Sequence, residues 1–504
     1  MRNKTAPQRS LTLFRTTLTA LALFTLGACS SDDNGDGEDA YLNLYNASVN
    51  SPAIFLTVDE DLDSDDDDEI ETTYSSVRFG ESSGYKTIPS DSYYIELAWQ
   101  EEDSAARSDL TLVYQEQTKL EEDTIRLLVL AGDILDPSIV SYDIPVIDDD
   151  EDDDLDLFNL RVLNISTSTN PYDIYLSDAD ETFNEAELIG SYSPQELSEN
   201  QKFEQEQYIF YVTEAGSDEV VYQSNEVTFS LTSQYVIALR DNTGVGSAPV
   251  LLDLIASGGT TNLPDDDSEA RVRYFNGMQV SELMPEYTGA INISTSSDGS
   301  DLDVSALATN SFSEPLDKDN GDYSVRINDS QTDERLFANQ LLSLPENTYK
   351  TIFYYIQEEA VDEDDDGNVD ENDDGIVDAY KAVLRTLETT TLEGNSIYEH
   401  QVKVVNLVDN TEFSRIATYF VKSDEIISTA EATRSVVFGN QSSLYLRNNT
   451  YQVFAVAEID GTEIILTQDE LTLDQDSNAM FMILVEDENA ENGVSIQWAD
   501  QVSE

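Results

Sequence analysis

The segment "VDEDDDGNVDENDDGIVD" (361–378) spaces its carboxylates as a divalent cation requires. Its first loop has the form D-x-D-x-D-G-x-x-D with glycine at position six, and a second loop of the same form follows, sharing one aspartate. Calcium takes about six to eight oxygen ligands, which a turning loop supplies from alternate side chains and, at position seven, from a backbone carbonyl. The predicted ligands are Asp362, Asp364, Asp366, Asn368 (carbonyl), Asp370, Asn372, Asp374, Ile376 (carbonyl) and Asp378.

These two loops resemble thrombospondin type 3 and dockerin-like calcium loops. They depart from an EF-hand because the twelfth positions are Asp373 and Lys381 instead of glutamate. The eight-residue overlap also leaves no room for flanking helices. The resemblance implies a calcium site of roughly 0.1–1 mM affinity, as in extracellular modules.

Two other acidic runs lack this spacing. Residues 59–71 and 148–156 are almost as rich in carboxylates, but neither contains the glycines that a turning calcium loop needs. We therefore expect the first to be an acidic loop within a folded domain and the second to be a solvated linker.

One further motif matches a catalytic pattern, but its surroundings in the sequence do not support catalysis. "GESSG" (80–84) matches the G-x-S-x-G nucleophile elbow, which requires a preceding strand, a following helix and a nearby histidine. Here another strand-like segment follows, and His400 is the only histidine of the chain. A turn around Ser82 is the better interpretation, and one histidine with one cysteine excludes His-rich metal sites and Cys–His catalysis.

The N-terminal segment resembles the signal peptide of bacterial lipoproteins. A basic start and a short apolar run (18–28) lead to "LGAC", which is similar to a lipobox and ends at Cys29, the only cysteine. The resemblance implies cleavage before Cys29 and its acylation, which anchors the chain to a membrane. Ser30 follows the cysteine where the family often has the aspartate of inner-membrane retention, so we expect an outer-membrane lipoprotein.

The whole chain is strongly acidic. It carries 103 acidic and 25 basic residues, for a net charge of −78. Such a charge repels nucleic acid and bare anionic membrane, and it attracts cations. The strand-like apolar segments between the acidic runs nevertheless predict folded domains.

Four segments share the pattern apolar, any, apolar, apolar, Asn. They are "LNLYN", "LRVLN", "VRYFN" and "VKVVN", and their asparagines Asn46, Asn164, Asn276 and Asn406 are spaced by domain-sized intervals. A short strand, a tyrosine-led strand and a long hairpin recur in order after each pentamer. Alternating apolar residues and no helical period predict an all-β fold of antiparallel strands.

This order of strands and turns resembles the bacterial domain of unknown function (DUF) 4397, most closely in the first copy with "NASVNSP" (46–52). The resemblance implies immunoglobulin-like sandwiches in tandem on a secreted or surface protein, and it implies no catalytic residue.

We therefore predict an all-β chain of four tandem immunoglobulin-like antiparallel β-sandwich domains. The expected parts are a signal peptide (1–28), a lipidated tether (29–40), domain 1 (41–147), an acidic linker (148–156), domain 2 (157–257), a linker (258–269), domain 3 (270–397, with the calcium insert 362–378) and domain 4 (398–504).

The expected function is a lipid-anchored scaffold, adhesion or ligand-presenting protein of the cell envelope, with a cell-surface protein or glycan as partner and without catalysis. Two alternatives stay open: a glycan-binding module, which needs exposed aromatic side chains, and a carboxylate-based polysaccharide-acting enzyme, which needs an acidic cleft. The side of the membrane that the domains face is also open.

Overall fold

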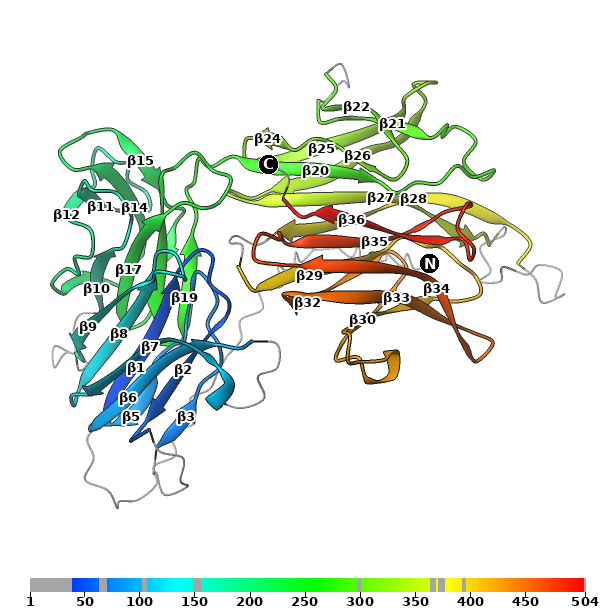
Figure 1. The fold of residues 1–504 in the computed structure, drawn as a ribbon. Helices are drawn as coiled ribbons and strands as arrows, with labels where there is room; N and C mark the ends of the chain where they lie inside the picture. The colour runs from blue at the N-terminus through cyan, green and yellow to red at the C-terminus, as the bar shows by residue number, and fades with distance from the viewer. Residues whose placement is uncertain are drawn as a thin grey trace, which may run out of the picture. The chain divides into compact units, whose positions relative to one another are not determined.

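A computed structural model describes residues 39–62, 70–101, 107–147, 156–296, 301–362, 369, 377–391 and 396–502 (Figure 1). The chain divides into a unit Met1–Gly37 and a unit Glu38–Glu504, and all of the described residues belong to the second. They form β-strands and two single-turn 3-10 helices, η1 (Arg107–Asp109) and η2 (Ile427–Thr429). None of the described helices has the length and apolarity needed to cross a membrane.

Within the described residues, the strands form eight sheets, and each of four sandwiches consists of two of these sheets. In each sandwich we call the sheet with the pentamer strand the inner sheet and the other the outer sheet.

Sandwich 1 has the inner strands β1 (Asp39–Ala47), β4 (Glu81–Ser82), β5 (Lys86–Pro89), β8 (Thr124–Ala131) and β9 (Ser138–Pro145), and the outer strands β2 (Ile54–Asp59), β3 (Glu71–Thr73), β6 (Ser92–Trp99) and β7 (Thr111–Lys119). Sandwich 2 has the inner strands β10 (Leu157–Asn164), β13 (Gln201–Glu204), β17 (Gln234–Asp241), β18 (Val250–Ala256) and β19 (Gly259–Leu263), and the outer strands β11 (Tyr172–Asp178), β12 (Glu187–Tyr192), β14 (Gln207–Glu214), β15 (Val220–Gln223) and β16 (Val227–Thr228).

Sandwich 3 has the inner strands β20 (Ala270–Asn276), β23 (Ser311–Phe312), β24 (Leu316–Lys318), β27 (Tyr349–Ala360) and β28 (Tyr380–Thr391), and the outer strands β21 (Ala290–Ser294), β22 (Val304–Ala308), β25 (Gly321–Asp329) and β26 (Arg335–Leu344). Sandwich 4 has the inner strands β29 (Glu399–Asn406), β32 (Asn440–Arg447), β35 (Met480–Glu486) and β36 (Val494–Asp500), and the outer strands β30 (Arg415–Val421), β31 (Ala432–Val437), β33 (Asn449–Ile459) and β34 (Thr462–Leu473).

The all-β fold is confirmed, with one feature that the sequence pattern missed. In each sandwich the pentamer strand pairs in parallel with a later inner strand: β1 with β8, β10 with β17, β20 with β27, and β29 with β35. The outer sheet serves as the crossover that such a parallel pair requires. Apolar residues alternate in the same way in parallel and antiparallel strands, so the sequence pattern could not reveal the parallel pairing.

The segment 258–269, which we expected to be a linker, contributes a strand. β19 pairs with β18 from Leu252↔Leu263 to Ala256↔Gly259, and Leu263 joins the core of sandwich 2. A run of three consecutive polar residues, Thr260, Thr261 and Asn262, made this edge strand look like a spacer.

The four pentamer asparagines make the same contacts. All are at most 1% exposed, and each side-chain oxygen accepts the backbone N–H two residues later at 3.0–3.2 Å. Each side-chain amide donates to a carbonyl that belongs to the outer sheet or to the loop beside it, at 2.9–3.1 Å: Val77, Tyr192, Leu307 and Val436. The asparagine therefore ties the end of the pentamer strand to the second sheet, which is why it recurs.

Two other recurring contacts support the repeat. The asparagine carbonyl accepts the N–H of a residue with positive φ in every copy: Gly80, Gln195, Asn310 and Gly439. The leading tyrosine of the tyrosine-led strand donates its hydroxyl to the carbonyl four residues earlier, as in a tyrosine corner, in every copy: Tyr93, Tyr208, Tyr323 and Tyr451.

The inner sheets pack against one another in pairs. Tyr45 and Val129 of sandwich 1 share a buried cluster with Leu163 and Val236 of sandwich 2. Another cluster joins the inner sheets of sandwiches 3 and 4: Phe275, Phe353, Tyr355, Val405, Leu407, Phe481, Ile483 and Val485. Because each inner sheet is covered on both faces, its strands carry apolar residues at odd and at even positions. The pentamers show this pattern.

Candidate functional site

The calcium-loop insert lies at the tip of the β27–β28 hairpin of sandwich 3. The two strands pair without interruption from Tyr349↔Thr391 to Ala360↔Tyr380, and they lie side by side in Figure 1. The N–H of Val361 continues the ladder with the carbonyl of Ala379 at 2.9 Å. The predicted loops therefore begin and end on adjacent ends of one rigid hairpin.

Most of the predicted ligands lie outside the described residues: Asp364, Asp366, Asn368, Asp370, Asn372, Asp374 and Ile376. Asp362 and Asp378 are described, and the N–H of Asp378 donates to the carbonyl of Val369 at 3.1 Å. In the described part of the chain, no group of three or more His, Cys, Asp or Glu side chains is placed to hold a metal. Cys29 also lies outside the described residues.

The base of the first acidic run contains its own cation. Asp59 and Glu71 face each other across β2 and β3, and Arg107 contacts both of them and Glu96. The Arg107 Nη2–Glu96 Oε2 distance is 2.8 Å, and Asp59 is only 1% exposed. Burial alone would lower the pKa of Arg107, but its hydrogen bonds to these carboxylates raise it above the ordinary value. This arginine therefore offsets part of the negative charge of the three carboxylates.

The residues around Ser82 form no nucleophile elbow. Phe79 and Gly80 form a turn, and Ser82 then lies in the two-residue strand β4, paired with Tyr45. The ring Nε2 of His400 lies 2.7 Å from Asn448 Oδ1, within sandwich 4. Neither residue is arranged for acyl transfer, and the turn that we predicted around Ser82 lies directly before β4, at Phe79 and Gly80.

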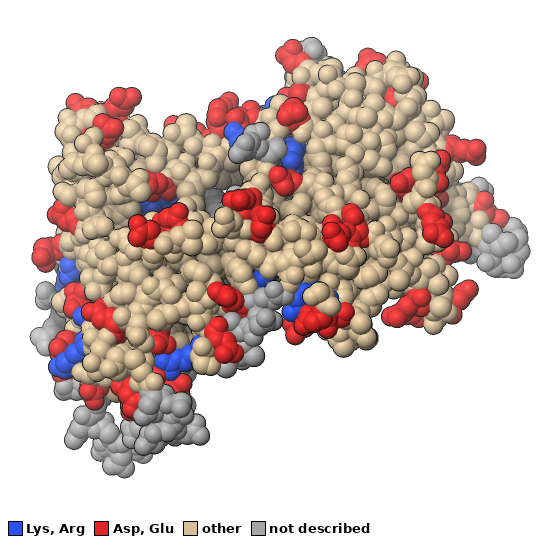
Figure 2. Space-filling view, viewed as in Figure 1, with Lys and Arg blue, Asp and Glu red and all other residues tan. Residues whose placement is uncertain are grey.

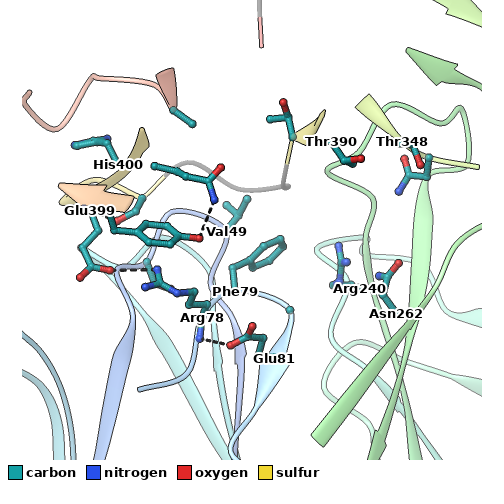
Figure 3. Close-up of a pocket in the computed structure, with 18 residues that line it drawn as sticks. Val49, Arg78, Phe79, Glu81, Arg240, Asn262, Thr348, Thr390, Glu399 and His400 are labelled. Carbon is teal, nitrogen blue, oxygen red and sulfur yellow. Dashed lines mark hydrogen bonds and ion pairs between the residues drawn. The ribbon is translucent and has the colours of Figure 1, made fainter. Parts of the chain in front are cut away.

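A cavity of about 360 Å³ lies where residues from all four sandwiches come together (Figure 3). Arg78 and Phe79 line it from sandwich 1, Arg240 from sandwich 2, Thr391 from sandwich 3, and Gln401 and Tyr445 from sandwich 4. No feature of the sequence pointed to this cavity, because its lining comes from loops and strand ends far apart in the chain.

The positive charge of each arginine in the cavity is already offset by a carboxylate. Arg78 Nη1 lies 3.2 Å from Glu399 Oε2, and its guanidinium lies 3.7 Å from the ring centre of Tyr445. Arg240 Nε lies 2.8 Å from Oδ2 of the fully buried Asp253, which also accepts hydrogen bonds from Tyr45 and Asn262. Around these ion pairs the cavity is lined by Glu81, by uncharged polar and apolar residues, and by the rings of Phe79 and Tyr445.

The second residue of each pentamer has a structural position that the sequence pattern did not explain. These residues are Asn43, Arg161, Arg273 and Lys403, and their side chains point from the inner sheet toward the partner sandwich. Asn43, Arg273 and Lys403 are buried, and Arg161 is half-buried. A polar residue recurring inside an apolar pentamer was the only sequence signal for them.

No protein-family model and no curated protein matches this chain. Among solved structures, the Bacillus anthracis TIE protein is 9% identical over 90% of this chain and 75% of its own, with a TM-score of 0.14. A candidate adhesin from Bacteroides ovatus is 8% identical over 45% of this chain and 95% of its own, with a TM-score of 0.15. BcpA, the major pilin subunit of Bacillus cereus, in a variant form, is 8% identical over 65% and 98%, with a TM-score of 0.13. At these scores the fold assignment rests on the sheets themselves.

Proposed function

We propose that this chain is a non-catalytic, lipid-anchored protein of the bacterial cell surface, and that its paired sandwiches form a stiff scaffold that presents loops to a partner. The observation that supports this most is the packing of the inner sheets. Each pair of sandwiches shares a continuous buried cluster, so two sandwiches behave as one body. Function is then left to loops and hairpin tips, where binding residues concentrate on rigid scaffolds.

The surface suits such a role. Figure 2 shows acidic side chains scattered over the whole visible face, with few basic ones between them. This distribution keeps an exposed protein soluble and disfavours nucleic acid as a partner. The partner in this proposal is a cell-surface protein or glycan.

Calcium at the tip of the β27–β28 hairpin is part of the proposal. Carboxylates spaced as in 362–378 repel one another until a cation binds between them. The continuous ladder up to Ala360↔Tyr380 fixes both ends of the insert, so the loops lose less conformational freedom on binding.

Isothermal calorimetry on the soluble chain from residue 29 onward, with Cys29→Ser, tests the calcium site. We expect uptake with a Kd of roughly 0.1–1 mM, which is lost when Asp364, Asp366 and Asp374 are changed to Asn. The matched control changes Asp65, Asp66 and Asp67 to Asn, which removes as much charge from the first acidic run. Equal loss of uptake in both variants would show that calcium binds to acidic surface in general and not to the spaced loops.

The anchor is tested separately. In cells that process lipoproteins, we expect the chain to fractionate with the outer membrane, and Cys29→Ser to release it from that fraction. Retention of the Cys29→Ser variant in the membrane would contradict a lipid anchor. Protease treatment of intact cells then reports which side the sandwiches face.

The glycan alternative receives little support from the cavity. Sugars stack on open aromatic faces, but Arg78 covers a face of Tyr445, and Arg240 lies 5.0 Å from the ring centre of Phe79. A glycan array with the soluble chain decides between a pure scaffold and a lectin-like module.

A further inference from the structure

Sandwiches 1 and 4 are in contact, although they belong to different pairs. Arg78 Nη1 in sandwich 1 lies 3.2 Å from Oε2 of Glu399, the first residue of β29 (Figure 3). The same guanidinium lies 3.7 Å from the ring centre of Tyr445 in β32. The N–H of Ile397, just before β29, donates to the carbonyl of Asn50 at 3.0 Å. The first pair (sandwiches 1 and 2) and the second pair (sandwiches 3 and 4) are therefore joined here by residues that are far apart in the sequence.

This contact is mainly polar, unlike the interfaces within each pair. Within the pairs, the inner sheets share buried apolar clusters. Among the described residues, Ile397 is the one residue from outside sandwich 1 that packs on the apolar core of that sandwich. Arg447 Nη1 adds a hydrogen bond to the carbonyl of Glu101 at 3.0 Å. Because relative motion is expected wherever an interface is not large and apolar, this contact should open more readily than the interfaces within the pairs.

The charges of this contact are also accessible to salt. The side chain of Arg78 is 37% exposed and that of Glu399 is 15% exposed. The other ion pair beside the cavity, between Arg240 and Asp253, has side chains that are 6% and 0% exposed, and it contacts Tyr45 in the interface of the first pair. Salt screens exposed charges much more than buried ones. Added salt therefore weakens the contact between sandwiches 1 and 4 before it weakens the interface of the first pair.

The two pairs are joined a second time, between sandwiches 2 and 3, and this joint is close. The N–H of Gly246, in the loop between β17 and β18, donates to Asn347 Oδ1 at 3.0 Å. A side chain at Gly244 would overlap Asn347, and one at Gly246 would overlap Ser268. The chain also passes from sandwich 2 to sandwich 3 here, through residues 264–269. The pairs therefore stay attached at this joint when the contact between sandwiches 1 and 4 opens.

We infer that the contacts of Arg78 with Glu399 and Tyr445 form a salt-dependent latch between the two pairs, and that release of this latch lets the pairs swing apart about the joint between sandwiches 2 and 3. The cavity of about 360 Å³ lies between latch and joint, since Arg78, Glu399, Tyr445 and Asn347 all line it. Release therefore widens the cavity, and it uncovers the face of Tyr445 that Arg78 covers. The latch presupposes the rigid pairs of the proposed function, but it requires neither calcium nor a lipid anchor.

Distance measurements by fluorescence energy transfer test the latch. Cys29 is the only cysteine, so the soluble Cys29→Ser chain accepts two new cysteines as dye sites. The reporting pair is Leu135→Cys in sandwich 1 with Ile426→Cys in sandwich 4, and the control pair is Leu135→Cys with Leu188→Cys in sandwich 2. All three positions are exposed. Between about 0.1 M and about 1 M salt, where the Debye length falls from about 10 Å to about 3 Å, we expect the reporting distance to lengthen and the control distance to stay constant.

Charge variants locate the latch. Arg78→Glu places a carboxylate opposite Glu399, so the reporting distance should already be long at low salt. Exchange of the two charges, Arg78→Glu with Glu399→Arg, restores the attraction and should shorten the distance again. The matched control is Arg126→Glu, which makes the same charge change at an ion pair with Asp143 that lies within sandwich 1. This control should keep the wild-type distance.

Two outcomes overturn the latch alone. One is a reporting distance that changes neither with salt nor in Arg78→Glu, which would make the contact between sandwiches 1 and 4 a fixed one. The other is the same lengthening in Arg78→Glu and in Arg126→Glu, which would assign the opening to net charge. A control distance that changes with salt is a different result, because it contradicts the rigid pairs of the proposed function and the latch with them.

Discussion

The two inner-sheet interfaces have the same architecture but treat buried charge differently. Between sandwiches 1 and 2, Arg240 is matched by Asp253, which Tyr45 and Asn262 also contact. Between sandwiches 3 and 4, Arg273 and Lys403 donate their hydrogen bonds to carbonyl oxygens, the Arg273 guanidinium lies 4.2 Å from the ring centre of Phe312, and a cluster of phenylalanines packs nearby. The same packing of sheets therefore tolerates either a buried ion pair or buried cations that are held by carbonyl oxygens and aromatic rings.

The difference shows which part of each interface carries its stability. In the first, the carboxylate is indispensable because it neutralises a buried guanidinium. In the second, aromatic packing supplies the stability, and Phe481 contacts both Phe312 and Phe353 at ring-centre distances of 6.2 and 5.3 Å. The following predictions test this division.

The largest effect is expected at the aromatic end of the second interface. Phe481→Ala should lower the free energy of unfolding of sandwiches 3 and 4 by about 3–5 kcal/mol, since it leaves a cavity among buried rings. Urea denaturation followed by tryptophan and tyrosine fluorescence measures it. A loss below about 1 kcal/mol would show that the interface contributes little to stability.

Removing the buried carboxylate of the first interface should cost nearly as much. Asp253→Ala leaves Arg240 buried without its partner, for which we expect a loss of about 3 kcal/mol or more. Asp143→Ala is the matched control, because it removes the partner of Arg126 at a site where the aspartate side chain is 51% exposed. That surface pair should contribute no more than about 1 kcal/mol.

A feature common to the sandwiches of both pairs should have the same effect in each. Asn164→Ala and Asn276→Ala both leave a buried N–H and a buried carbonyl without partners, so each should cost about 1–3 kcal/mol. A large inequality between the two, measured in the same denaturation experiment, would show that the repeated asparagine does not play one structural role.

The smallest effect concerns Lys403 and depends on pH. Burial lowers the pKa of Lys403 to about 8, so between about pH 8 and its unfolded value the unfolded chain binds more protons than the folded chain. Stability should therefore rise with pH from about 8, by no more than about 1.4 kcal/mol per pH unit.

Lys403→Met should remove that rise and leave stability at pH 7 unchanged or slightly higher, since an apolar group replaces a buried charge. The same rise in the variant would assign the pH dependence to another group.

Several elements of the structure follow from local sequence. The pentamer asparagines and the leading tyrosines of the tyrosine-led strands recur because each satisfies neighbouring backbone groups in every copy. The position of the calcium-loop insert between two strands of sandwich 3 was also predictable, because its ends continue their alternation into β27 and β28. Calcium binding itself stays a prediction.

Other elements could not be predicted from a single sequence. Strand alternation does not distinguish the parallel pairing of β1 with β8 from an antiparallel one. Asp253 looked like one acid among 103, and only its position opposite Arg240 distinguishes it. The cavity lined by Thr391 and Gln401 likewise depends on residues from four separate sandwiches.

The sequence by itself determined that this protein is all-β and internally repeated, because alternation, turn residues and backbone-satisfying side chains act over a few residues. Only the tertiary structure decided which face of each inner sheet packs on its own outer sheet and which packs on another sandwich. Leu44 lies in the core of sandwich 1, whereas its neighbour Tyr45 lies in the interface with sandwich 2. Both are fully buried, and that distinction arises from docking between distant segments, which no local pattern encodes.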